Sequence, residues 1–340
     1  MLEKPDLPDE KIAACLAQAY GLRVASLAFL PLGADLNTAV YRAVAGDGTP
    51  YFVKLRRGAF HAASVAIPRF LSDQGMRQII PPLRTGAGAL WANLAPFKVI
   101  LYPFVAGHDG FEVALSDQQR IEFGAALKRL HTARIPAALT HGVRRETFTP
   151  HWRQTVTAFL ARIDHEAFAE PAAAALAAFL NSQRPETLAL LRRSERLAQA
   201  VRAQSRPFVL CHADIHGWNL LLGNDGALYM VDWDTLIFAP KERDLMFVGV
   251  GLGGRGHAPA AEEALFYQGY GPSQPDPRAL AYYRYERIIE DIALYCQQLL
   301  LTDEGGEDRA QALAYLQSNY GPGGTIAMAT RADKTRAGDG

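Results

Sequence analysis

Two short stretches, HADIHGWN at residues 212–219 and VDWD at residues 231–234, hold the densest group of chemically active side chains in this sequence. Each follows an apolar stretch typical of a strand, so we predict that two strands deliver both groups to a common edge. Asp214, Asn219 and Asp232 supply a carboxylate, a carboxamide and a second carboxylate. Mg2+ prefers such hard oxygen ligands. We therefore expect Asn219 and Asp232 to hold the metal and Asp214 to accept a proton.

Three further side chains are candidates for the same site. Lys54 ends the strand-like segment YFVK, and it stands out because the chain has only seven lysines. Taken alone, such a residue is usually a solvated lysine on an edge strand. His212 is expected to orient the loop by hydrogen bonding, and Asp234 either to bind the metal or to support a residue that does.

Together these motifs resemble the aminoglycoside phosphotransferase family, a relative of the protein kinases. The order of the parts agrees from about residue 20 to residue 318, and VILYPFVAG (99–107) and ERDLMFVG (242–249) most resemble its spectinomycin phosphotransferase-like branch. The resemblance implies an α+β, bilobal, protein-kinase-like fold. A small antiparallel β lobe, residues 1–106, is expected to bind nucleotide. A larger, mainly helical lobe, residues 107–320, is expected to carry catalysis and acceptor binding.

Residue patterns agree with that organisation. In the first lobe they predict a helix at 9–19, a helix at 61–74 with Pro68 as a kink or as its true start, and strands at 24–30, 38–45, 51–55, 90–91 and 98–104. In the second lobe they predict short strands at 208–211, 220–222 and 227–231, and helices at 116–132, 150–162, 171–180, 186–204, 278–301 and 308–318. Residues 321–340 have few large apolar side chains, so we expect a disordered tail.

The resemblance also implies roles for individual residues. Asp214 is expected to orient and deprotonate a hydroxyl of a small-molecule acceptor, and Lys54 to contact the α- and β-phosphates of ATP. Asn219 and Asp232 are the implied Mg2+ ligands. Asp244 is expected to support the catalytic loop, although a carboxylate at a helix start has an ordinary explanation in the helix dipole.

The nucleotide is expected to meet two backbone segments. Gly33, between the first two strands, can bring N–H groups near the phosphates, although Asp35 would repel them if it pointed inward. The Tyr102 carbonyl and the Phe104 N–H are expected to pair with the adenine edge. Pro103 between them has no N–H to offer.

One feature departs from the kinase pattern. Kinases pair the strand lysine with a glutamate on the following helix, but between Lys54 and residue 102 the only acid is Asp73. Three alternatives follow: Asp73 serves, a carboxylate such as Asp232 balances Lys54, or activity is reduced.

The acceptor is expected to bind in the helical lobe. Glu286, Glu290 and Asp291 have helical spacing and can meet a cationic aminocyclitol, although a solvated helix face is the alternative. Two other patterns have ordinary explanations. The GxGxxG match at 249–254 lacks the surrounding βαβ unit of a dinucleotide site, and Cys211 is expected to be buried at a strand end and not to act as a nucleophile.

Composition excludes several classes of protein. Thirty-five basic and thirty-five acidic residues cancel, which argues against binding to nucleic acid or to a membrane surface. The three cysteines are far apart, so neither a disulfide framework nor a zinc site is expected. The N-terminus lacks the apolar core of a signal peptide, and no apolar run approaches the roughly 20 residues that span a bilayer. We expect a cytoplasmic protein.

The resemblance and its one departure from the kinase pattern imply three alternative functions. The favoured one is an ATP-dependent O-phosphotransferase acting on an aminoglycoside or aminocyclitol antibiotic such as spectinomycin. The second is a metabolic kinase for an amino alcohol or sugar. The third, motivated by the missing helix glutamate, is a nucleotide-binding pseudokinase that acts as an interaction module.

Overall fold

The computed structural model describes residues 3–33, 35–249, 258–302 and 305–337, and the chain forms two compact units. The first unit comprises Met1–Arg145, Val209–Phe238 and Gly251–Ser273, and the second comprises Glu146–Phe208, Ala239–Val250 and Gln274–Gly340. Residues 209–238, which carry both motifs, belong to the same unit as the N-terminal strands. The predicted boundary at residue 106 therefore does not separate the compact units.

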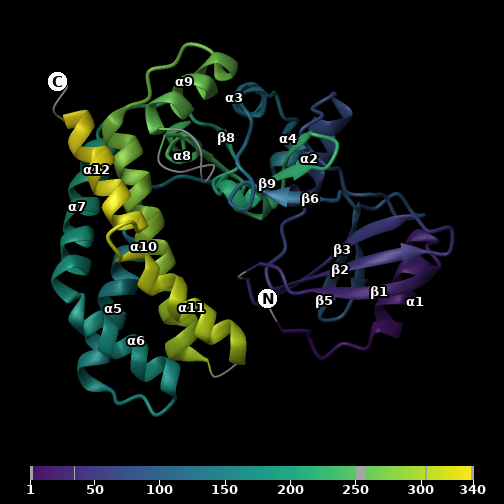
Figure 1. The fold of residues 1–340 in the computed structure, drawn as a ribbon, viewed down its shortest axis with the longest axis horizontal. Helices are drawn as coiled ribbons and strands as arrows, with labels where there is room; N and C mark the ends of the chain where they lie inside the picture. The colour runs from purple at the N-terminus through teal and green to yellow at the C-terminus, as the bar shows by residue number, and fades with distance from the viewer. Residues whose placement is uncertain (1–2, 34, 250–257, 303–304, 338–340) are drawn as a thin grey trace. The chain divides into compact units, whose positions relative to one another are not determined.

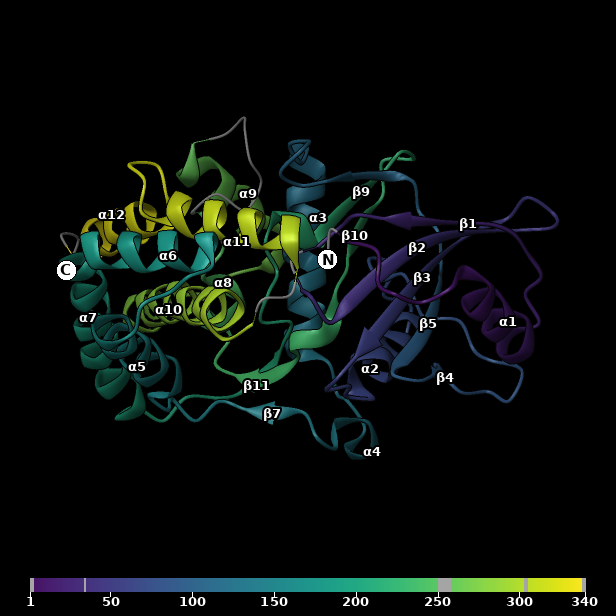
Figure 2. The same cartoon turned by 90° about the horizontal axis from the view of Figure 1, so that it is seen from below.

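A five-stranded antiparallel sheet, in the order β1-β2-β3-β5-β4, forms the N-terminal part of the first unit (Figures 1 and 2). Its strands are β1 (Val24–Leu30), β2 (Thr38–Ala45), β3 (Pro50–Arg57), β4 (Ala92–Leu94) and β5 (Phe97–Pro103). The strand predicted at 90–91 is displaced to β4. Leu90 is apolar for another reason, because it packs in a small cluster with Val65 and Ile100.

Alternation along β3 fixes the direction of its lysine. Helix α1 (Asp9–Tyr20) buries Ile12 and Leu16 in the same core as Val53 and Leu55. Because successive side chains of a strand point to opposite faces, Lys54 points away from that core.

Three further helices belong to the first unit, besides the single turn α4 (Ala137–Thr140). Helix α2 (Ala63–Asp73) contains Pro68 in its interior, and α3 (Asp117–Thr132) begins with the predicted capping box of Ser116 and Gln119. Helix α9 (Pro259–Tyr270) packs closely on α3 (Figure 1). Glycine is required at this contact, since a Cβ on Gly269 would lie 1.7 Å from the Ile121 carbonyl oxygen.

Two small sheets complete the first unit. One has the order β10-β9-β6, from β6 (Gly107–Asp109), β9 (Leu220–Gly223) and β10 (Leu228–Met230). The other has the order β7-β11-β8, from β7 (Arg144–Arg145), β8 (Val209–Cys211) and β11 (Ile237–Ala239). Strands β8 and β10 lie in different sheets, so the prediction that they deliver the two motifs to one common edge is wrong.

The second unit is helical and is organised around α10 (Pro277–Leu301). Around it pack α5 (His151–His165), α6 (Pro171–Ser182), α7 (Arg184–Arg202), α8 (Glu242–Leu245), α11 (Gly306–Asn319) and α12 (Thr325–Ala337) (Figures 1 and 2). Among the described residues, no helix is long and apolar enough to cross a membrane.

Helix α12 corrects the prediction of a disordered tail. Ile326 and Ala329 are buried, and the Asp333 carboxylate lies 2.8 Å from a guanidinium nitrogen of Arg193 on α7. Small side chains therefore suffice here, because α10 and α11 supply the packing surface.

Candidate active site

His212 holds the first motif in place. Its ring is fully buried, with Nε2 2.9 Å from the Val231 carbonyl oxygen, and the Asp214 N–H points at Nδ1 from 3.4 Å. A backbone N–H can donate only to a ring nitrogen without hydrogen, so we assign the neutral tautomer with hydrogen on Nε2. The Thr235 hydroxyl donates to the His212 carbonyl at 2.7 Å. These bonds fit the predicted orienting role.

The Asn219 amide fixes the backbone of Asp214. Its Nδ2 donates to the Asp214 carbonyl at 2.7 Å and lies 3.4 Å from Oδ2 of the same residue. Oδ1 of Asn219, the atom predicted to bind the metal, accepts no hydrogen bond from the described residues. The Val231 N–H donates to the Asn219 carbonyl at 3.0 Å, which brings the 3-10 turn η1 (Gly217–Asn219) beside the residue that precedes Asp232.

Two residues of the motifs have unusual backbone conformations. Ala213 has φ 72° and Asp232 has φ 60°, both in the left-handed region that side chains disfavour. Such strain persists where neighbouring structure imposes it, and it clusters at functional sites. Asp232 leads directly into the second 3-10 turn, η2 (Trp233–Thr235), whose Trp233 indole N–H donates to the Met230 carbonyl at 3.1 Å.

Lys54 joins β3 to the second motif. Its Nζ lies 2.8 Å from Asp232 Oδ1 and 2.8 Å from Asp234 Oδ2, and its side chain is 11% exposed. Burial alone would lower the pKa of Lys54, but the two carboxylates raise it above its ordinary value, so the lysine is charged. Asp73 instead pairs with Arg69, one turn away on α2, at 2.9 Å. Of the three alternatives for the missing glutamate, the structure therefore supports the balancing carboxylate.

Asp234 is surrounded by cations. Burial would raise its pKa, but Lys54, Arg56 and the Ser64 hydroxyl together lower it, so the carboxyl is ionised. Arg56 lies 3.9 Å from Asp234 Oδ2 and also pairs with Asp35. That pairing neutralises the acid that was expected to repel phosphate. Arg56 was missed by the sequence analysis, although it lies two residues after Lys54 and therefore on the same face of β3.

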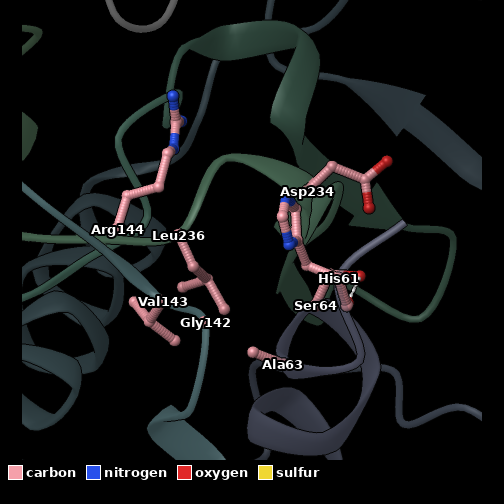
Figure 3. A pocket seen from close by; sticks show the side chains of 8 residues that line it. All are labelled: His61, Ala63, Ser64, Gly142, Val143, Arg144, Asp234 and Leu236. Carbon is pink, nitrogen blue, oxygen red and sulfur yellow. Dashed lines mark hydrogen bonds between the residues drawn. The ribbon is translucent and has the colours of Figure 1, made fainter. Parts of the chain in front are cut away.

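A small pocket adjoins Asp234. It is lined by His61, Ala63, Ser64, Gly142, Val143, Arg144, Asp234 and Leu236, and it has room for about one water molecule (Figure 3). Figure 3 shows Arg144 and Asp234 on opposite sides of it. The pocket is too small for a nucleotide or an acceptor.

The strand register bears on the predicted adenine contacts. The Phe104 N–H donates to the Pro50 carbonyl at 3.4 Å, and Tyr102 lies opposite Phe52. In an antiparallel pair, N–H and carbonyl of alternate residues face the same partner strand. The Tyr102 carbonyl and Phe104 N–H therefore face β3, which argues against the predicted pair, and the Pro103 carbonyl faces away from it.

The Tyr102 side chain lies on the same face of the sheet as Lys54, because Lys54 lies opposite Ile100 and Tyr102 follows two residues later. Its ring lies 6.3 Å from that of Phe52, edge to face. Burial, Asp234 and Asp232 raise the pKa of Tyr102, and Lys54 lowers it by less. Gly33, with φ 80°, has the left-handed conformation that favours glycine, and its phosphate contact stays a prediction.

The predicted acceptor residues are already paired. Glu286 is buried against Arg153 and the Ser194 hydroxyl. Glu290 lies 3.4 Å from Arg243, and Asp291 lies 3.2 Å from Arg287. These ion pairs argue against the predicted contacts with a cationic acceptor, and the burial of Glu286 also argues against a solvated helix face.

Three other predicted features have different outcomes. Asp244 is buried in α8 of the second unit, and its support of the catalytic loop stays a prediction. Cys211 is buried at the end of β8, as expected. The GxGxxG match at 249–254 lies, from residue 250 onward, outside the described residues.

Comparison with known proteins gives a consistent picture. Residues 28–283 match the phosphotransferase enzyme family (APH). The crystal structure of spectinomycin phosphotransferase, APH(9)-Ia, in complex with ADP and spectinomycin is similar with a TM-score of 0.88 and 34% sequence identity, covering 97% of this chain and 99% of that chain. The AMP-bound complex of APH(9)-Ia has a TM-score of 0.82 and 33% identity, covering 94% and 98%.

More distant similarity extends to the fold alone. An amicoumacin kinase in complex with AMP-PNP and Ca2+ has a TM-score of 0.62 at 15% identity, covering 97% of this chain and 94% of that chain. No curated protein matches this chain in sequence.

Proposed function

This chain belongs to the phosphotransferase enzyme family and is an ATP-dependent small-molecule kinase, and we propose that its acceptor is a hydroxyl of an aminocyclitol such as spectinomycin. The observation that carries the proposal is the contact of Lys54 with Asp232 and Asp234, which joins the expected phosphate-binding strand to the expected metal-binding segment. The 34% identity with a spectinomycin phosphotransferase over nearly the whole chain supports the acceptor class.

Asp214 is proposed to take the proton of the acceptor hydroxyl. His212 and Asn219 hold its backbone from two sides, so the carboxylate is oriented before the acceptor arrives. Such preorganisation matters because phosphoryl transfer depends mainly on positioning and on charge stabilisation.

The donor set fits Mg2+. Asn219 Oδ1 and the half-exposed Asp232 carboxylate are hard oxygen donors, and Asp234 adds a third close by. When bound, the ion neutralises charge on the transferred phosphate. Lys54 bridges two carboxylates, so it can exchange one of them for a phosphate oxygen and keep the other.

For the adenine edge we propose the Pro103 carbonyl and the Val105 N–H. The register of β5 turns the Pro103 carbonyl away from β3, and Val105 follows two residues later, which is the spacing that a carbonyl and an N–H need on one edge of an extended chain. Tyr102 then contributes its ring, and not its backbone, to the nucleotide site.

The pseudokinase alternative is no longer supported. It was motivated by the missing helix glutamate that would pair with Lys54, and Lys54 pairs with two other carboxylates. The metabolic-kinase alternative predicts the same machinery with a different acceptor, so an acceptor panel distinguishes it.

The test is Mg2+-dependent turnover of ATP by the full chain with spectinomycin, other aminoglycosides, choline and a simple sugar. We expect spectinomycin to be phosphorylated with the highest kcat/KM, and expression of the chain to protect a susceptible host cell. Preference for choline or the sugar overturns the acceptor proposal, and retained ATP binding without turnover of any acceptor overturns the kinase proposal.

The Asp214→Ala variant is the matched control. It should lower kcat by about 10²–10⁴-fold, the usual contribution of a general base, with little change in nucleotide affinity. Near-normal turnover of this variant contradicts the role given to Asp214.

A further inference from the structure

Three rings lie together, two of them in the first motif. The ring centroids of Phe111 and Trp218 are 5.1 Å apart, and those of His216 and Trp218 are 5.6 Å apart. Trp218 is 52% exposed and Phe111 is 40% exposed, whereas the His216 side chain is 18% exposed. These three residues form what we call the aromatic patch. Large side chains are seldom left so exposed, and a contiguous exposed apolar patch often marks a binding surface.

The patch is held by backbone bonds. The Asp109 carboxylate accepts the N–H groups of Phe111 and Glu112 at 2.8 and 3.0 Å, which closes the turn after β6. The Gly110 N–H donates to the Gly217 carbonyl at 2.9 Å, and a Cβ on Gly110 would lie 3.0 Å from that oxygen. The turn carrying Phe111 is therefore locked onto the loop carrying Trp218, so the rings are presented in a fixed arrangement.

The patch adjoins the reacting carboxylate. His216 Nε2 lies 3.4 Å from Asp214 Oδ1, and Trp218 immediately precedes Asn219. A molecule that covers the patch therefore reaches the oxygen atoms to which we assigned proton transfer.

The charges around the patch select the kind of molecule. Aromatic faces attract cations, and the Asp214 carboxylate lies beside one of the rings. Glu112, which follows Phe111 in the chain, is exposed and lies 3.1 Å from His108. The carboxylate beside the His216 ring and the one that follows Phe111 in the chain favour a protonated amine and disfavour an anionic acceptor such as a sugar phosphate.

We propose that the aromatic patch binds the acceptor. The carbon-rich face of a hydroxylated ring that carries a protonated amine stacks on Trp218 and Phe111, which directs one hydroxyl to Asp214. This inference rests on the proposed function and names residues that determine its acceptor specificity.

The test compares steady-state constants of Trp218→Ala and Phe111→Ala with those of the wild type, using spectinomycin or whichever acceptor of the panel is turned over fastest. Removing a stacked aromatic ring should raise the acceptor KM by roughly 10–100-fold, equivalent to about 1.4–2.8 kcal/mol, while the KM for ATP changes much less. Trp218→Phe should restore most of the affinity. The control is Leu301→Ala, a residue of similar exposure on α10, which should leave both constants unchanged.

Binding is measured separately from turnover. Titration of the acceptor without nucleotide should shift the fluorescence of Trp218, and the shift should be absent in Trp218→Phe. Phe111→Ala lies on a different segment, so it tests the patch even if Trp218→Ala fails to fold.

Each other result overturns the inference. An unchanged acceptor KM in both alanine variants shows that the patch does not bind the acceptor, although the kinase itself stands. A rise confined to the KM for ATP assigns the patch to the nucleotide. Equal kcat/KM for spectinomycin and the neutral cyclitol myo-inositol removes the preference for an amine. If no acceptor is phosphorylated by the wild type, the proposed function fails and this inference fails with it.

Discussion

Two ion-pair clusters, one in each unit, show how the same chemistry serves different ends. In the first unit Lys54 meets Asp232 and Asp234, and Asp232 is half-exposed with a left-handed backbone. In the second unit Arg153 meets Glu286, and both side chains are more than 90% buried. The first cluster is open to an incoming ligand, whereas the second is enclosed and links α5 to α10. Matched amide substitutions separate the two roles.

The largest effect on stability is expected for Glu286→Gln. It removes the buried carboxylate partner of Arg153 and leaves only the half-exposed Glu195, 3.0 Å away; breaking a buried ion pair on one side typically costs about 3–5 kcal/mol of unfolding free energy. Urea denaturation measures the change. The double variant Arg153→Met/Glu286→Leu should recover much of it, because apolar residues can replace a buried pair. A double variant as unstable as the single one contradicts a closed structural pair.

Asp232→Asn should change turnover strongly and stability only slightly. Its half-exposed pair contributes at most about 1 kcal/mol to stability. Turnover should nevertheless fall by roughly 10²–10³-fold, the order expected when one electrostatic contact of a reaction site is removed. The same purified variant is assayed for activity and for unfolding. A loss of stability as large as that of Glu286→Gln would make the first cluster structural as well.

The pH dependence of the stability of Asp234→Asn tests the more buried carboxylate of the first cluster. Hydrogen bonds to a charged group contribute about 1.5–3 kcal/mol, so this variant should be less stable than the wild type at neutral pH. The folded-state pKa of Asp234 is lowered, so its stabilisation is fully present above the unfolded value of about 3.9 and is lost as the pH falls through the lower folded value. The difference between wild type and variant should therefore shrink on acidification below about pH 4. A constant difference down to pH 2 would show that Asp234 is not held ionised by Lys54 and Arg56.

The smallest effect is expected for Glu170→Ala in the second unit. The Glu170 carboxylate accepts the N–H groups of Ala172 and Ala173 at the start of α6 and pairs with Arg309. The Arg309 hydrogen bond and the two backbone bonds lower its pKa to about 2. Loss of a helix cap costs about 1 kcal/mol, and the buried Arg309 keeps its hydrogen bonds to the Gln298 and Leu299 carbonyls when Glu170 is removed. That contribution should be complete above about pH 4.3 and vanish as the pH falls towards 2, which urea titrations at several pH values measure.

Local patterns were sufficient for most of the fold. Strands β1 to β3, the turn between β2 and β3, the capping box of α3 and the long helices follow from alternation, helical period and cap chemistry, which depend on neighbouring residues. The prediction of a disordered tail was wrong for the converse reason. Helix α12 is stabilised by surfaces of α10 and α11, and composition within 321–340 carries no information about them.

For the candidate site too, contacts within one loop could be predicted, whereas contacts between distant segments could not. The HxDxxxxN spacing was sufficient to predict that Asp214 and Asn219 adjoin, since five residues of one loop separate them. The partners of Lys54 could only be narrowed to alternatives, because 178 residues separate it from Asp232. The register of β5 argues against the predicted Tyr102 backbone contact, and the sequence did not determine that register, although a shift of one residue reverses every side chain and every carbonyl of a strand.

The chain passes from one unit to the other five times, which has a consequence for its synthesis on the ribosome. The sheet of β1 to β5 is complete by residue 103, but the first unit needs segments that extend to Ser273. Asp232 follows the end of β5 at residue 103 by 129 residues, which take on the order of ten seconds to appear at typical elongation rates. Throughout that interval Lys54 lies in a nascent sheet without its two aspartates. A chain truncated before residue 232 therefore contains the nucleotide-facing strands but no counter-charge for their lysine.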